Sequence, residues 1–231
     1  MKRNILLIGG STGIGLEISN QLSDDNNVIV ASRTKGELKE GIKHLDFDVT
    51  KDNIEDLDLP DEIHGLVYCP GTINLKPFKM LKPKDFEEDL NLNFLGLVKV
   101  VHGLLPKLKN AEDASLVFFS SVAVKVGMPF HSSVAAAKGA IEGFARSLAA
   151  EYAPGLRVNV IAPSLTQTPL AEKLLSNDAK KEKMSERHPL KRIGTTSDMA
   201  NAATFLLSDK SGWITGQVIG IDGGLSVLNI A

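Results

Sequence analysis

The residues whose types and spacing could do chemistry lie mainly between positions 118 and 143. A short apolar run there ends in Ser120 and Ser121, and a segment rich in alanine and glycine follows with a single cation, Lys138. A long cationic side chain among such small residues either lies at an interface or holds a ligand. We therefore expect the reacting end of a ligand site in this segment.

A glycine-rich turn follows the first apolar run and forms a second candidate site. Its glycines have the spacing Gly-x-x-x-Gly-x-Gly, and a helical pattern begins at the turn. Glycines permit a tight turn and a close backbone approach, so the amino end of the helix can face a pyrophosphate. The turn therefore predicts a bound dinucleotide. The residues expected at its phosphates are Gly9, Ser11, Thr12, Gly13, Ile14 and Gly15.

The end of the second apolar run bears on which dinucleotide is bound. A carboxylate at position 32 would bind the hydroxyl groups of the adenine ribose and repel a 2′-phosphate. The chain has Ser32 there, followed by Arg33, whose guanidinium can pair with a phosphate through two hydrogen bonds. We therefore expect NADP(H) as the preferred cofactor and NAD(H) as the second choice. The alternative for Arg33 is a solvated loop cation.

Apolar runs that alternate with helical patterns predict the fold that positions these residues. The runs are apolar almost throughout, as strands buried on both faces are, and they occupy residues 4–10, 27–32, 44–49, 63–69, 114–120, 156–162 and 216–222. Helical patterns occupy residues 83–108, 133–152, 169–186 and 196–207. Such alternation indicates right-handed crossovers. We expect one doubly wound α/β domain of the Rossmann type over residues 1–231, with about seven parallel strands and helices on both faces.

Two connections carry separate expectations. The link between Ser32 and Lys43 has room for barely two helical turns, so this half of the sheet should be trimmed. The charged segment 181–192 is either a mobile flap over the site or a solvated face, and we favour the flap.

Composition excludes several classes of function. The 231 residues include 26 Lys plus Arg and 28 Asp plus Glu, for a net charge of −2, which indicates no nucleic-acid or membrane-surface partner. The single cysteine, Cys69, excludes an internal disulfide and is typical of a reducing compartment. No apolar run approaches the ~18 residues that span a bilayer, and the four apolar residues before Gly9 are too few for a signal peptide. We expect a cytoplasmic globular protein without a metal site.

Together these motifs resemble the short-chain dehydrogenase/reductase family over essentially the whole chain. The motifs that carry the resemblance are the glycine-rich turn, the pair at 48–49, Gly71, the Asn93-to-Gly96 spacing, the Ser121-to-Lys138 spacing and the closing segments 157–169 and 188–224. The resemblance implies the Rossmann-type fold and an NAD(P)-dependent oxidoreductase. Within the family the chain looks most like the 3-oxoacyl-carrier-protein reductases.

The resemblance also assigns residues to the cofactor. Those at the adenine, along the backbone approach and on the nicotinamide side are Asp48, Val49, Cys69, Gly71, Lys138, Pro163, Thr166 and Thr168. Asp48 could instead be a turn residue. Cys69 could be a nucleophile, but a small buried thiol is the simpler interpretation, because no cation or histidine adjoins it in sequence.

At the reacting end the resemblance gives roles to three residues. Ser121 matches the serine that hydrogen-bonds the substrate carbonyl, with Ser120 as a competitor that could simply cap the strand end. Lys138 matches the lysine that binds the nicotinamide ribose. Asn93 matches the asparagine that supports a water relay from that lysine, although it could also be an ordinary polar helix residue.

The family's active-site tyrosine, four residues before the lysine, is replaced here by Val134, which has no proton to give. Three proton sources remain open: His131, Tyr68, and a water held by Asn93 and Lys138. Histidine suits proton donation near pH 7, but His131 would stand ~10 Å from Lys138 along a helix axis. It could equally be a loop or helix-terminal residue.

We expect an oxidoreductase that transfers hydride to or from a carbonyl or alcohol substrate, such as a 3-oxoacyl group or another ketone. The alternative is a catalytically silent family member that holds NADP(H) and has a regulatory or assembly role. Small residues at 136, 140 and 143 permit close helix approach. Members of the family assemble through two long helices. The resemblance and these small residues together therefore predict a homodimer or homotetramer.

Overall fold

A parallel sheet of seven strands forms the centre of the molecule in the computed structural model, which describes residues 2–229. The strand order is β3-β2-β1-β4-β5-β6-β7, and every neighbouring pair is parallel. The strands are β1 (Asn4–Ile8), β2 (Asn27–Ser32), β3 (Lys43–Asp46), β4 (Gly65–Tyr68), β5 (Ala114–Phe119), β6 (Leu156–Pro163) and β7 (Val218–Ile221). All seven predicted strands are confirmed, as is the doubly wound α/β class.

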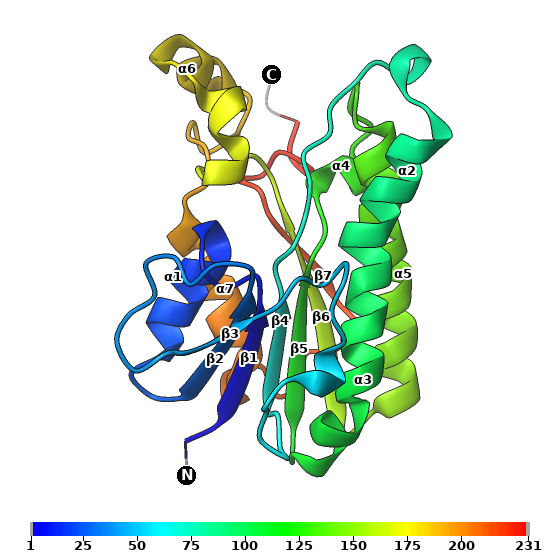
Figure 1. Cartoon of the computed structure of the whole chain (residues 1–231). Coiled ribbons are helices and arrows are strands. Elements are labelled where there is room, and N and C mark those ends of the chain that lie inside the picture. Colours follow the sequence, from blue (N-terminus) through cyan, green and yellow to red (C-terminus); the bar gives the residue numbers. More distant parts are fainter. Residues whose placement is uncertain (1, 230–231) are drawn as a thin grey trace.

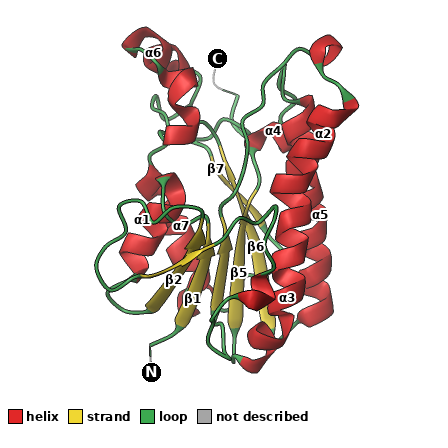
Figure 2. Ribbon diagram, in the orientation of Figure 1, coloured by secondary structure: helices red, strands yellow, loops and turns green. Residues whose placement is uncertain are grey.

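Helices cover both faces of the sheet, as Figures 1 and 2 show. One layer consists of α1 (Gly13–Leu22) and α7 (Thr196–Leu207), which pack against each other. The other layer contains α2 (Pro83–Leu90), α3 (Gly96–Asn110) and α5 (Ser132–Tyr152). The short α4 (Val122–Lys125) and the charged α6 (Asp178–Glu186) lie beyond the upper end of the sheet in Figure 1.

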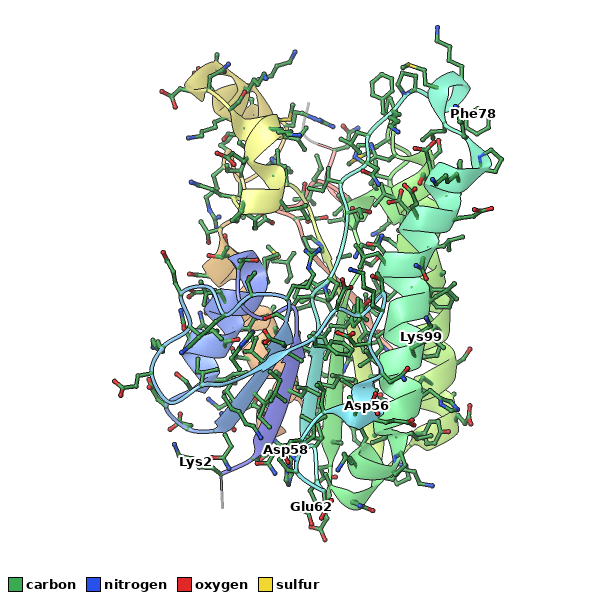
Figure 3. All side chains as sticks on the ribbon, in the orientation of Figure 1. Lys2, Asp56, Asp58, Glu62, Phe78 and Lys99 are labelled. Carbon is green, nitrogen blue, oxygen red and sulfur yellow. The ribbon has the colours of Figure 1, made fainter. Side chains whose placement is uncertain are left out.

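Alternation along the strands divides the core into two layers. In β1, Leu6 and Ile8 belong to the cluster beneath α3 and α5, whereas Ile5 and Leu7 belong to the cluster beneath α1 and α7. All four side chains are almost fully buried, as expected for strands covered on both faces. Side chains fill the space between sheet and helices (Figure 3). The burial of about 25 cal/mol per Å² of apolar surface stabilises both layers.

Two predicted helices are interrupted. The pattern at 83–108 contains a π-helical turn, Asn91–Leu95, between α2 and α3, and such turns are frequent at functional sites. The pattern at 169–186 divides into a 3-10 helix, Pro169–Leu175, and α6. Asn177 starts α6 because its side-chain oxygen accepts a hydrogen bond of 2.9 Å from the Lys180 backbone N–H.

The link between β2 and β3 contains no helix, although the sequence left room for two turns. Gly36, with φ +58, lies so close to the phosphate turn that a Cβ would stand 2.5 Å from the carbonyl oxygen of Ser11. The link therefore packs against the glycine-rich turn, and its residues Arg33 and Thr34 line the cavity at the carboxyl ends of the strands.

Within residues 2–229 no helix is long and apolar enough to cross a membrane. The same residues hold no group of three or more His, Cys, Asp or Glu arranged to ligate a metal ion.

Candidate active site

A cavity of about 920 Å³ opens along the carboxyl ends of the strands. In open α/β sheets this is where ligands bind. Of the residues singled out from the sequence, the cavity is lined by Gly9, Ser11, Thr12, Gly13, Ile14, Gly15, Arg33, Asp48, Val49, Cys69, Gly71, Ser121, His131, Lys138, Pro163, Thr166 and Thr168. The fold thus brings together positions from the whole length of the chain. Asn93 lies behind the cavity wall.

The glycine-rich turn has the geometry of a phosphate cradle. Gly9 and Gly13 have φ values of +75 and +54, which favour glycine. A Cβ on Gly15 would stand 2.6 Å from the carbonyl oxygen of Gly9, so this position needs glycine for close packing. The side chain of Thr12 does not cap α1, and the first turn of α1 has no acidic residue. The N–H groups and dipole at this end of α1 therefore suit an anion.

At the carboxyl end of β2 the cavity is lined by an exposed cation, Arg33. Arg33 lines the cavity and makes no ion pair within residues 2–229. The neighbouring Ser32 hydroxyl donates to the Thr34 carbonyl over 2.9 Å and lies 3.1 Å from Nε2 of His44. The proton of Ser32 is thereby engaged, whereas the Arg33 guanidinium has no ion-pair partner among the described residues.

Asp48 forms the turn that the sequence suggested and also lines the cavity, while its contact with adenine stays a prediction. One carboxylate oxygen accepts from the Thr50 hydroxyl at 2.7 Å and the Thr50 backbone N–H at 3.0 Å, as in an Asx turn. These hydrogen bonds from Thr50 lower the pKa of the Asp48 carboxyl. The same residue lines the cavity, so its turn presents the carboxylate to the site.

Lys138 lies in the part of the cavity next to the end of β5. Its side chain is buried, and Nζ donates a hydrogen bond of 2.9 Å to the carbonyl oxygen of Phe119, the last residue of β5. Burial lowers the pKa of Lys138 from 10.5 to about 8, against the opposing influence of Cys69 and Asp89. The side chain therefore crosses from α5 to the strand end, and its ammonium group loses its proton at a lower pH than an exposed lysine does.

Gly71 makes room for this ammonium group. A Cβ at this position would stand 3.2 Å from Nζ of Lys138 and 3.3 Å from Oδ1 of Asn93. Asn93 lies in the π-helical turn, and its Nδ2 donates to the Asp89 carbonyl at 2.8 Å and to the Thr72 hydroxyl at 3.0 Å. Lys138 and Asn93 therefore face one point beside Gly71.

The two serines at the end of β5 are distinguished by their partners. The Ser120 hydroxyl donates to Oε1 of Glu142 over 2.7 Å. Ser121 caps α4, and its oxygen accepts from the Ala123 N–H over 3.2 Å. This contact uses an acceptor site of Ser121 and leaves its proton for another oxygen in the cavity. The geometry favours Ser121 over Ser120 as the carbonyl ligand.

The proton-donor candidates are placed very differently. Val134 is buried in the cavity wall. His131 also lines the cavity, and its Nδ1 lies 2.7 Å from the Pro129 carbonyl, so this nitrogen carries a proton. Tyr68 is buried in the core beneath α3 and α5, its hydroxyl donates to the Leu92 carbonyl at 2.6 Å, and burial raises its pKa. Tyr68 is therefore withdrawn from the site.

The thiol of Cys69 lines the cavity close to the phosphate turn. A Cβ on Gly15 would stand 3.1 Å from its sulfur. Burial raises the pKa of Cys69 to about 12, despite the nearby Lys138. Cys69 is thus protonated at neutral pH, which favours a packing role over nucleophilic chemistry.

The nicotinamide-side loop and the segment after α6 close the cavity. Thr166 donates to the Ser164 carbonyl over 3.0 Å, and Thr168 caps the 3-10 helix that begins at Pro169. Ser164 also contacts Nε2 of His188 over 2.8 Å. Met184, Arg187 and His188 line the cavity, whereas α6 buries no residue. The charged segment 181–192 therefore contributes to the cavity wall and also exposes a solvated face, while its mobility as a flap stays a prediction.

Sequence reasoning missed several polar side chains. Asp89 is completely buried and accepts from Thr72, Asn74 and Ser133. Its position four residues before Asn93 was visible in the sequence, but its partners come from the loop after β4 and from the first turn of α5. The Ser164–His188 contact was equally hidden, because 24 residues separate the two side chains.

Comparisons with known proteins agree with this geometry. The family model described as enoyl-(acyl carrier protein) reductase matches residues 9–226. A tropinone reductase homologue from Arabidopsis thaliana is 32% identical over 97% of this chain and 93% of its own. A 3-oxoacyl-[acyl-carrier-protein] reductase from Staphylococcus aureus is 29% identical over 97% of this chain and 98% of its own. The structure of ElxO with NADP bound superposes with a TM-score of 0.87 at 26% identity, covering 97% of this chain and 99% of ElxO.

The chain belongs to the short-chain dehydrogenase/reductase family. Its named relatives in these comparisons are reductases, and the protein is a short-chain oxidoreductase.

Burial of Lys138 gives a pH signature that can be measured without cofactor. The unfolded chain binds more protons than the folded one between pH about 8 and 10.5, so this group raises the free energy of unfolding as pH increases through that window. Lys138→Met removes the effect. Between pH about 8 and 10.5 the wild type should therefore gain about 1–3 kcal/mol of stability that the variant does not gain. The difference, variant minus wild type, falls by that amount.

Urea unfolding of the cofactor-free proteins measures this difference. Lys99→Met, at the exposed position on α3 labelled in Figure 3, is the matched control and should give a flat difference. Titration of Cys69 is common to both proteins and cancels to first order. A flat or rising difference for Lys138→Met would contradict the depressed pKa.

Proposed function

We propose that the protein is an NADP(H)-dependent oxidoreductase that transfers hydride to or from a carbonyl or alcohol group. The position of Lys138 carries the proposal. Its buried ammonium lies beside Gly71, at the end of a cavity that begins with the phosphate turn and contains the Ser121 hydroxyl. A dinucleotide with its pyrophosphate at α1 would extend toward this end.

The cavity residues fit such a cofactor. Gly15 and Gly71 leave space that a Cβ would fill, at the turn and beside Lys138 respectively. Lys138 would hold the nicotinamide ribose, and Thr166 and Thr168 would contact the carboxamide and the phosphates. When bound, the nicotinamide supplies or accepts the hydride. Ser121 would donate to the substrate oxygen and polarise it.

The proton comes from an unusual source in this proposal. Val134 has none to give, and the Tyr68 hydroxyl is engaged with Leu92. A water held by Lys138 and Asn93 is our first choice, because both side chains face the same point beside Gly71. His131 is the second choice, since it lines the cavity.

The substrate end of the cavity is mainly apolar. Its wall includes Ile73, Leu75, Met128, Val134 and Leu170. Apolar walls with few polar groups are typical of sites for small organic ligands. We therefore propose a ketone or secondary alcohol with an apolar substituent, and a 3-oxoacyl thioester is one such compound. The named Staphylococcus aureus relative supports this class.

A face of small residues on α5 supports the proposal that the enzyme self-associates. Ala136 and Gly143 are exposed and Ala140 is half-buried, so they form a small-residue face on this helix. We propose a homodimer or homotetramer that packs through this face. A monomer in sedimentation experiments would contradict it. The single cysteine supports the cytoplasm as its location.

The preference for NADP(H) rests on Arg33. Arg33→Ala should weaken NADPH binding by about 10- to 100-fold through loss of charge-assisted hydrogen bonds, and should change NADH binding by less than about threefold. Cofactor fluorescence titration measures both affinities. The control is Lys35→Ala, an exposed neighbour outside the cavity lining. Equal losses for the two cofactors would exclude a 2′-phosphate contact at Arg33.

The proposed function is tested by following NADPH oxidation over a panel of ketones and 3-oxoacyl thioesters. We expect slow turnover by the wild type. Val134→Tyr should raise kcat by about 10²-fold or more, because a positioned general acid contributes roughly that factor. Val134→Phe fills the same space without a hydroxyl and should give no increase. Tight NADPH binding without turnover of any compound by wild type or Val134→Tyr would instead support the silent, cofactor-holding alternative.

A further inference from the structure

Asp89 is a buried carboxylate that the proposed reaction does not use. It lies near the end of α2 and has no solvent exposure. Its Oδ1 accepts from the Thr72 hydroxyl at 2.6 Å and from Nδ2 of Asn74 at 2.7 Å, while Oδ2 accepts from the Ser133 hydroxyl. Within residues 2–229 no cation lies within 4.0 Å of it. Three donors compensate a charge that burial alone would make costly.

Thr72 connects this carboxylate to the cavity. Thr72 lines the cavity, whereas Asp89 and Ser133 do not. The Thr72 oxygen also accepts from Nδ2 of Asn93 at 3.0 Å, and its backbone N–H approaches Oδ1 of Asn93 at 3.4 Å. It directly follows Gly71, where the ammonium of Lys138 and the amide of Asn93 converge. Hydrogen bonds therefore connect Asp89 through Thr72 to Asn93, whose amide oxygen lies beside Gly71 together with the Lys138 ammonium.

The charged groups around Asp89 belong to three elements. Lys138 on α5 and Lys76 in the loop before α2 both feel its charge. Lys76 is paired with Asp85 of α2 at 2.6 Å, and the Asp85 backbone carbonyl also lies 3.3 Å from the Ser133 hydroxyl. Lys76 already has a carboxylate partner. The electrostatic attraction between Asp89 and Lys138 is therefore the interaction that affects the cavity.

We propose that Asp89 and Thr72 form a proton relay for the reacting end. The relay stores and returns the proton that the family's tyrosine, replaced here by Val134, would otherwise supply. The proposal rests on the proposed oxidoreductase function and extends it. In alcohol oxidation the substrate O–H bond breaks, and its proton passes to the water beside Lys138 and Asn93. That water gives a proton to Thr72 Oγ1, and the Thr72 hydroxyl proton moves to the Asp89 carboxylate.

When bound, the oxidised cofactor would accept the electron pair of the substrate C–H bond as hydride, and the C=O bond would form. Asp89 ends as a carboxylic acid, so charge and protons balance. Carbonyl reduction is the reverse: Asp89 returns the proton through Thr72 and the water to the substrate oxygen. Thr72 can serve as a relay because a hydroxyl both donates and accepts, and in the structure it already does both.

The alternative role of Asp89 is purely structural, since it ties α2 to the first turn of α5. The two roles involve different oxygens of one carboxylate. Ser133 bonds Oδ2 on the side away from the cavity, whereas Thr72 bonds Oδ1 and reaches the cavity. Ser133→Ala is therefore the matched control for Thr72→Val. Each variant removes one hydroxyl that donates to Asp89, but only Thr72→Val interrupts the relay.

The experiment compares wild type, Asp89→Asn, Thr72→Val, Thr72→Ser and Ser133→Ala. Urea unfolding of the cofactor-free proteins measures stability, and fluorescence titration measures NADPH affinity. Single-turnover rates in H₂O and D₂O with the best substrate of the panel measure the chemical step. Loss of one buried hydrogen bond should lower the stability of Thr72→Val and Ser133→Ala by similar amounts, measured as similar downward shifts of the urea midpoint.

The relay predicts that rate and stability separate. Thr72→Val and Asp89→Asn should lose about 10²-fold in single-turnover rate and most of the solvent isotope effect, while NADPH affinity changes by less than about threefold. Thr72→Ser should keep the rate within about threefold because it keeps the hydroxyl, and Ser133→Ala should keep it too.

Rates that fall in proportion to stability in all variants would overturn the relay and leave a structural role. Wild type that turns over nothing would overturn the proposed function together with the relay, whereas an active wild type with equally active Asp89→Asn would overturn the relay alone.

Discussion

The hydrogen bond between the Lys138 ammonium and the Phe119 carbonyl is the contact on which the site depends. It joins α5 to the end of β5 and fixes a cation where the dinucleotide cavity ends. Burial makes the charge costly enough to lower the lysine pKa to about 8. Such a group would not persist in a core without a compensating role, because an apolar side chain of the same size would stabilise the fold more.

The surrounding backbone is shaped to accommodate that cation. Gly71 leaves the space into which Lys138 and Asn93 project, and the π-helical turn places the Asn93 side chain there. The parallel sheet supplies the remaining groups, because its strands deliver their carboxyl ends to one edge. The phosphate turn at β1 and the serines at β5 thus reach one cavity from positions more than a hundred residues apart.

Local patterns in the sequence were sufficient for the strands, the glycine-rich turn and the choice of candidate site residues, nearly all of which line one cavity. Buried parallel strands and glycine turns have short-range signatures, so these features can be predicted from a few residues each. Side-chain pairings cannot. Tyr68 ends a strand on the correct edge, yet strand alternation turns it into the core, where Leu92 accepts its proton. Asp89 meets Thr72 and Ser133 only after the π-helical turn and two loops have been placed, and the π turn shifts the register of an apparently continuous helix. The missing helix between β2 and β3 reflects packing of the link against the phosphate turn, which is also a tertiary effect.

The central claim is that this site moves hydride although Val134 occupies the place of the family's proton donor. Hydride transfer and proton transfer are separate steps, so loss of a positioned acid slows the reaction by about 10²–10⁴ without abolishing it. The most direct measurement uses NADPH deuterated at C4 of the nicotinamide and mass spectrometry of the product. The account predicts an alcohol one mass unit heavier, with deuterium at the former carbonyl carbon, in an amount matching the cofactor consumed. Product without deuterium from either C4 face, or no product from fully cofactor-bound protein across the ketone and thioester panel, would contradict it.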